Sequence, residues 1–155
     1  MAAATYIPTK LKKSQVIAAG PQLDFDTDTL IALIVTAGSG IPDTSKTGIQ
    51  FISDVTATNP EISYVGYTRQ TLTGVTVAFD AVGTTIVDFS FADITFVKNA
   101  LDPGTGRYLI IADSTSGGSD SSKAVIAVCD PNSTFSSTLG DLVFSSPSGG
   151  LIQWQ

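Results

Sequence analysis

Three aspartates at alternate positions are the first residues whose spacing suggests chemistry. Asp24, Asp26 and Asp28 are spaced like the opening ligands of an EF-hand calcium loop. That motif also requires a glycine at its sixth position and an acid at its twelfth. The chain has Thr29 and Val35 at those two positions, so the calcium motif fails. Because alternate residues of a strand point to the same side, we interpret the three carboxylates as the outward face of a strand.

The remaining reactive residue types are few. Histidine is absent, which excludes Ser–His–Asp and Cys–His catalysis and His-ligated zinc. The single cysteine, Cys129, lies in the apolar run Ala124–Asp130 with no flanking base or cation, so we expect a buried core residue. Glu61 is the single glutamate, and the Asp, Lys and Tyr residues form no cluster that suggests acid–base catalysis. The sequence therefore predicts no enzyme, no metal site and no cofactor.

Length and composition limit the remaining classes. A chain of 155 residues is the size of one domain, and 43% hydrophobic with 14% charged residues is too apolar for intrinsic disorder. The net charge of −6 argues against nucleic acid as a partner, because phosphate binding needs an excess of Lys and Arg. There is no secretory signal pattern and no run of 18 apolar residues. We expect a soluble protein, without a membrane segment, made in a cytoplasm.

The elements that must position these side chains are predicted to be strands. Val and Ile supply 26 residues and Ser and Thr supply 37, a bias that favours pleated strands with polar turns. Helix is expected only as one or two turns within 42–54. Two runs that are apolar on both faces flank a polar loop at 115–122 and predict a hairpin of two central strands. The expected strands are 23–35, 62–81 with a break at Gly74, 87–96 with a bulge or break near 92–93, 107–114, 123–130, 141–146 and 151–154.

These elements predict one antiparallel all-β domain, a β-sandwich or jelly-roll-like fold, over residues 21–155. Residues 1–20 are predicted to be an extended N-terminal arm, with the boundary at Gly20–Pro21. The arm is either a solvated tail or a segment that docks on an acidic partner surface. Trp154 either closes the core or anchors an interface. The candidate partner-binding residues are Tyr6, Ile7, Lys10, Leu11, Lys12, Lys13, Val16, Ile17 and Trp154.

The order of several short segments resembles a family of small structural proteins from tailed-bacteriophage virions. The first half carries an Asp–Thr pair leading into an apolar run, a Phe-led Ser–Asp–Val, and a glutamate followed by Gly–Tyr–Thr. The second half carries an Asp-rich strand, an Arg–Tyr strand and an apolar strand that ends in Asp. The resemblance spans about residues 21–154, with departures at Ile94–Phe96 and Cys129. In this sequence the segments are Asp26–Val35, Phe51–Val55, Glu61–Val77, Asp88–Phe96, Arg107–Asp113 and Ala124–Asp130.

The resemblance implies a non-enzymatic virion protein, either a capsid decoration or cement protein of the head exterior that bridges subunits of the major capsid protein, or a related fibre base. It also implies a homotrimer or another clustered arrangement, and production in the cytoplasm of a bacterial host. Two other classes remain open at this point. One is a tail or fibre component that contacts the host, and the other is a carbohydrate-binding β-module.

Overall fold

The computed structural model describes residues 4–6, 24–25, 27–39, 41, 49–79, 87–99, 104–115, 117–138, 140–146 and 152–154. Most elements within these ranges are short strands, as the β-branched composition predicts. The elements are β1 (Ala4–Tyr6), β2 (Leu30–Val35), α2 (Ile52–Thr56), β3 (Gln70–Thr71), β4 (Thr76–Phe79), β5 (Val87–Ser90), β6 (Ile94–Phe96), β7 (Thr105–Gly106), β8 (Tyr108–Asp113), β9 (Val125–Asp130), β10 (Phe135–Ser136), β11 (Leu142–Phe144) and β12 (Ile152–Trp154).

The largest sheet has five antiparallel strands in the order β1-β9-β8-β2-β3. β2 pairs with β8 over its whole length, from Leu30 opposite Asp113 to Val35 opposite Tyr108. β8 and β9 are neighbours joined by the polar loop, with a register shift between Ile111 and Ala112. The predicted hairpin of two central strands is therefore confirmed.

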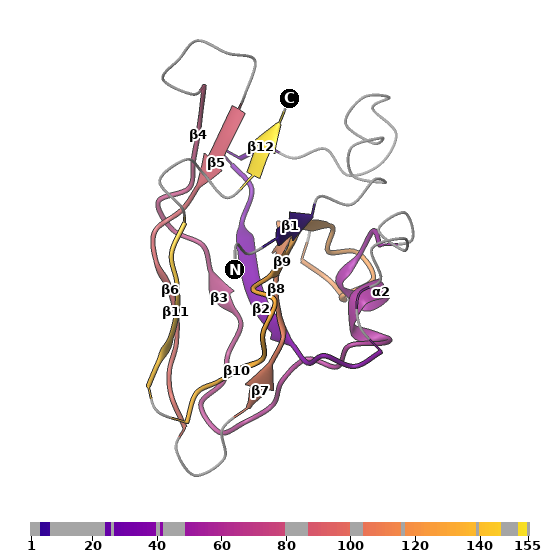
Figure 1. Ribbon diagram of the computed structural model, residues 1–155. Helices are drawn as coiled ribbons and strands as arrows, with labels where there is room; N and C mark the ends of the chain where they lie inside the picture. Colours follow the sequence, from indigo (N-terminus) through magenta and orange to yellow (C-terminus); the bar gives the residue numbers. More distant parts are fainter. Residues whose placement is uncertain are drawn as a thin grey trace.

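This sheet is the middle layer of the molecule, as Figure 1 shows, with α2 on one side and the smaller strand pairs on the other. One face packs on α2 through Ile52 and Val55, and the opposite face packs on the aromatic residues of β5 and β6, including Phe89 and Phe96. Every residue of β2 and β9 is buried. Because both faces of the sheet are covered, these strands are apolar at successive positions and do not alternate between apolar and polar residues.

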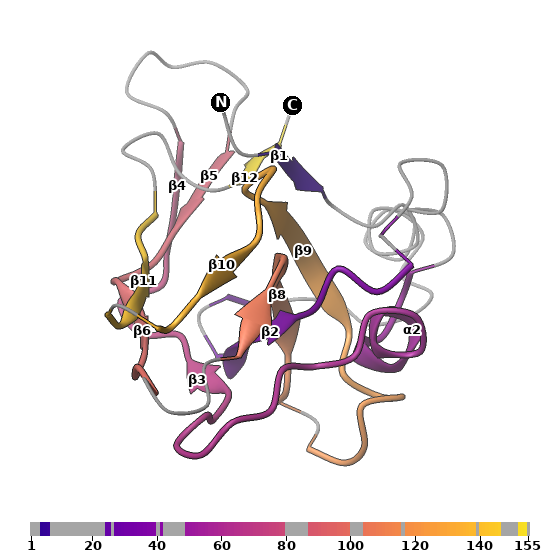
Figure 2. The ribbon, with the colours of Figure 1, turned by 60° about the horizontal axis from the view of Figure 1, so that its bottom comes forward.

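The strands that cover the second face belong to three separate small sheets, ordered β12-β5-β4, β11-β6 and β10-β7 (Figure 2). Phe89 and Phe91 point into the core, as do Ile94 and Phe96 after a change of parity, so the chain leaves strand geometry at residues 91–93. The predicted break is confirmed, and so is the antiparallel all-β class. The finer expectation of a sandwich or jelly roll is not confirmed, because this layer is divided among small sheets.

The predicted strand over 23–35 is too long, because strand geometry begins only at Leu30. The backbone N–H groups of Thr27 and Asp28 donate to the carbonyl of Asp24, at 3.1 and 2.7 Å, and Asp28 Oδ2 accepts from the backbone N–H of Asp24 at 2.7 Å. Asp24 and Asp28 thus belong to a turn, and their interpretation as the face of a strand is wrong. Aspartate side chains form such local hydrogen bonds in competition with strand pairing.

The only helix within the described residues, α2, begins near the end of the predicted helical segment 42–54. Asp54 Oδ2 accepts from the backbone N–H groups of Gln50 and Phe51, at 2.8 and 2.9 Å, and so satisfies donors at the start of the helix. The helix is short, and none in the described part of the chain has the length and apolar character needed to span a membrane.

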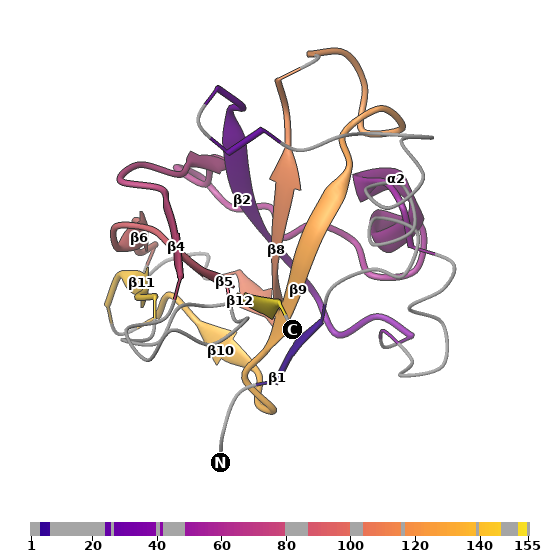
Figure 3. The same ribbon diagram turned by 90° about the horizontal axis from the view of Figure 1, so that it is seen from above.

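Part of the predicted N-terminal arm lies in the central sheet. Ala4–Tyr6 forms β1, which pairs with the end of β9 and so lies at the edge of the five-stranded sheet (Figure 3). Residues 7–20 and the predicted boundary at Gly20–Pro21 lie outside the described residues.

Candidate functional site

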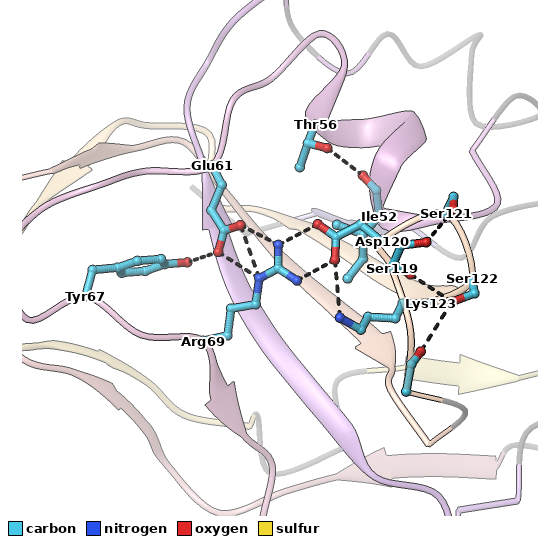
Figure 4. A network of polar contacts seen from close by, with 11 residues as sticks. Ile52, Thr56, Glu61, Tyr67, Arg69, Ser119, Asp120, Ser121, Ser122 and Lys123 are labelled. Carbon is cyan, nitrogen blue, oxygen red and sulfur yellow. Dashed lines mark hydrogen bonds and ion pairs between the residues drawn. The ribbon is translucent and has the colours of Figure 1, made fainter.

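Among the described residues, the most connected polar cluster surrounds Arg69, which lies between Glu61 and Asp120 (Figure 4). Its guanidinium donates to Glu61 through Nε at 3.0 Å and through Nη2 at 2.6 Å. On the other side Nη1 and Nη2 donate to the two carboxylate oxygens of Asp120, at 2.6 and 2.7 Å. Paired hydrogen bonds from a planar guanidinium to a carboxylate give both strength and a defined orientation.

Three separate segments supply this cluster. Glu61 lies where the chain forms a bridge to Val35 at the end of β2, and Arg69 immediately precedes β3. Asp120 belongs to the β8–β9 loop, and its carbonyl accepts from the backbone N–H of Ser53 in α2 at 3.2 Å. Arg69 therefore connects the edge of the central sheet to the loop against which the helix is held.

Tyr67 extends the cluster into the core. Its hydroxyl donates to Glu61 Oε1 at 2.9 Å and accepts from the backbone N–H of Ile34 at 3.0 Å. The ring stacks on Phe96, with centroids 5.8 Å apart and planes 10° apart. Burial is the main cause that raises the pKa of Tyr67 far above its ordinary value of 10.0. The hydroxyl therefore stays protonated and serves as a structural hydrogen-bond partner.

The charges of the cluster are matched. The hydrogen bonds from Arg69 are the largest cause that lowers the pKa of Asp120 below 3.8, and Lys123 Nζ lies 3.4 Å from the same carboxylate. Hydrogen bonds to Asp120 and then Glu61 raise the pKa of Arg69 further. Asp120 and Arg69 both stay ionised near neutral pH, so this pair is suited to holding segments together and not to exchanging protons.

A second ion pair joins the ends of β8 and β9. Arg107 forms a salt bridge with Asp130, and its Nη2 donates to Asp130 Oδ2 at 3.1 Å. The Arg107 guanidinium also lies over the ring of Tyr108, 5.1 Å from its centroid. Asp130 Oδ1 accepts from the backbone N–H of Asn132 at 2.7 Å, which places Asn132 in a turn with φ of 60°.

The outer side of the β6–β11 pair exposes apolar side chains. Val97 and Val143 are 60% and 54% exposed, and Val143 lies opposite Thr95 in the register of the pair. Val65 is 82% exposed, and its carbonyl accepts from Asn99 Nδ2 at 3.1 Å, which holds its turn beside the end of β6. We call Val65, Val97 and Val143 the valine strip. Val97 shares the exposed face of the pair with Thr95 and Val143, and apolar side chains exposed on one face can contribute to a protein contact surface.

The structure places two of the sequence-predicted partner-binding residues in strands. Tyr6 in β1 pairs with Val128, and Trp154 in β12 pairs with Val87. β1 and β12 lie near each other in Figures 1, 2 and 3, so the first and last strands approach the same end of the molecule. The other candidates lie outside the described residues, namely Ile7, Lys10, Leu11, Lys12, Lys13, Val16 and Ile17. Cys129 is buried, as expected from the sequence.

Sequence reasoning missed the Arg69 cluster, although a signal was present. The chain has two arginines, Arg69 and Arg107, and each forms salt bridges with carboxylates. In a chain with so few charged residues, arginines beside apolar runs are good candidates for partly buried ion pairs. Their partners were not predictable, because Asp120 is one of 13 aspartates, each a possible partner in the sequence alone.

Within the described ranges, no group of three His, Cys, Asp or Glu side chains is arranged to hold a metal ion. Comparison of the chain with known protein families, curated proteins and solved structures finds no match.

Proposed function

We propose that this protein is a non-enzymatic structural component of a tailed-bacteriophage virion, a decoration or cement protein on the exterior of the head. The observation that carries the proposal is that residues of the segments with the family resemblance make structural contacts with one another. Glu61 and Tyr67, from the segment with Gly–Tyr–Thr, hydrogen-bond to each other, and Arg107 and Asp130 form an ion pair between two core strands. These polar residues hold the fold together, as a structural protein requires.

The surface offers two kinds of contact with a capsid. The valine strip provides apolar area that becomes favourable when it is covered, at about 25 cal/mol per Å². The first 20 residues carry Lys10, Lys12 and Lys13 and no acid, while the chain as a whole has a net charge of −6. A basic segment on an acidic body favours an acidic patch of the major capsid protein as partner.

A cement function follows from repetition. Each copy makes a modest contact, and copies clustered as a trimer over a junction of capsid subunits would bind with the combined strength of several contacts. Bridging neighbouring subunits opposes their separation under the pressure of packaged DNA.

Cryo-EM of purified virions of the phage that encodes the chain tests this function. Density that fits the central sheet and α2 on the head shell is the expected result. Density on the tail or its fibres would replace the proposal with the tail or host-contact alternative. Absence of the chain from purified virions would overturn any virion role and leave the carbohydrate-binding module as the next hypothesis.

Sedimentation with empty heads then identifies the contact. Replacement of Lys10, Lys12 and Lys13 by Ser should weaken binding and reduce its dependence on salt. A V97S/V143S variant should weaken binding without changing its salt dependence. Equal co-sedimentation of both variants and the native chain would exclude these two surfaces as the site of attachment.

A further inference from the structure

The outer edge of β9 is covered by two separate segments of the chain. Near its start, the backbone N–H of Val125 donates to the carbonyl of Gln50 at 2.9 Å, and Phe51 forms a bridge with Ala124. Its last three residues pair with β1, with Ala4 opposite Asp130, Thr5 opposite Cys129 and Tyr6 opposite Val128. β9 is buried along its whole length, so the backbone groups of this edge require a partner strand.

β1 is attached to the sheet in a way that allows exchange. It has three residues, and among the strands that the structure describes it pairs with β9 alone. Two strands, β9 and β8, separate it from β2, the next described strand, so its departure would leave the β2–β8–β9 pairings intact. Seventeen residues, 7–23, lie between Tyr6 and Asp24. Fully extended, such a segment spans about 55 Å, enough to reach a second molecule packed beside the first.

We propose that Val128–Asp130 is a strand-exchange site and that its occupant in the assembled protein is Ala4–Tyr6 of a second copy of this chain. The exchanged strand makes the same register and the same hydrogen bonds as its own, so exchange sacrifices no pairing. Residues 1–20 carry three lysines and no acids, a charge of +3. Residues 21–155 carry the other 5 bases and all 14 acids, a charge of −9, so arm and body attract each other between neighbouring copies as well as within one chain. The proposal concerns the protein alone and does not depend on the virion role.

The pairing of Thr5 with Cys129 supplies a direct test. Residues directly opposite in an antiparallel pair have Cα atoms about 4.5–5.5 Å apart, a separation that a disulfide spans. A T5C/C129S chain, whose thiol is at position 5, is mixed with the native chain, whose thiol is at position 129. The two are refolded together from denaturant at high protein concentration and oxidised gently. Non-reducing electrophoresis then detects any disulfide between the two chains.

Strand exchange predicts a disulfide-linked heterodimer, on the order of ten-fold more abundant than in a matched mixture of S63C/C129S with the native chain. Ser63 is exposed and belongs to none of the strands that pair with β9, so this control measures random oxidation. The T5C chain that retains Cys129 is oxidised in parallel. If this T5C chain forms the disulfide only within single molecules, and the mixture gives no heterodimer, then β1 stays on its own sheet and the proposal is wrong. If no disulfide forms in either sample, the pairing itself is overturned.

Discussion

Arg69 donates two hydrogen bonds to Asp120, at 2.6 and 2.7 Å, although 51 residues separate the two in the chain. The contact fastens the β8–β9 loop to the segment that enters β3. Because the same guanidinium also holds Glu61, one side chain fixes three segments around the end of the central sheet. The stability of the fold should therefore respond to changes at this cluster more than at other charged positions.

Replacement of Arg69 by Met should lower the free energy of unfolding by about 2–3 kcal/mol, because it leaves two partly buried carboxylates facing each other without a cation between them. The free energy of unfolding of the Arg69→Lys variant should lie between those of the native chain and the Met variant, since an ammonium keeps the charge but loses the paired hydrogen bonds. Urea unfolding at pH 7 measures the change as a shift of the midpoint with an unchanged slope. The exposed Lys98 provides the control, and K98M should stay within about 0.5 kcal/mol of the native chain. A loss for R69M no larger than this would show that the cluster contributes little.

The cluster should also make stability depend on acid. The hydrogen bonds from Arg69 hold the pKa of Asp120 below 3.8, its ordinary value in the unfolded chain. The stabilisation is therefore present above that pKa and is lost as the pH falls through the lower pKa of the folded state. Native and D120N chains should differ most near pH 7 and converge as the pH falls through the lowered pKa of the folded state. Unfolding midpoints measured from pH 7 to pH 2 provide the test, with D93N, which removes an exposed carboxylate, as the matched control. A constant difference between native and D120N chains would contradict the linkage.

Replacement of Tyr67 by Phe should cost about 1–3 kcal/mol, because the backbone N–H of Ile34 loses its acceptor in a buried strand. The effect should depend on alkali in a defined direction. Burial raises the pKa of Tyr67 above 10.0, so its stabilisation is complete below that pH and declines as the pH rises beyond it. Guanidinium unfolding at about pH 8 and about pH 11 should show a narrower gap between native and Y67F at the higher pH. A gap that widens with pH would overturn this assignment.

Gly38 and Gly66 offer a matched test of backbone packing. Both have positive φ, +46° and +92°. A Cβ at Gly38 would lie 2.0 Å from the carbonyl oxygen of Thr58, whereas one at Gly66 would meet no atom within 4 Å. G66A should cost about 1 kcal/mol from backbone conformation alone, and G38A should cost about 3 kcal/mol or more because the backbone itself must move. Thermal unfolding measures the loss of stability in both variants. Equal losses would mean that the backbone at Thr58 moves at little cost in free energy.

The central sheet is predictable from the residue pattern, because strands that are buried on both faces are apolar at nearly every position. β2, β8 and β9 are continuous apolar runs, and a strand covered on both sides has few polar positions. The parity change between Phe91 and Ile94 likewise predicted a break, since the period of a strand is two residues. Asp24 and Asp28 were misread because alternation alone does not distinguish a strand face from a turn closed by local aspartate hydrogen bonds.

The all-β class, the central hairpin of β8 and β9 and the burial of Cys129 are predictable from the residue pattern, because each depends on neighbours along the chain. Three further features emerge only in the folded molecule: Arg69 joins Glu61 to Asp120, the second layer consists of three small sheets, and Ala4–Tyr6 completes the edge of β9. These features depend on which distant segments meet. A local pattern records whether a residue is buried, but the identity of its partner is set by how the whole chain packs.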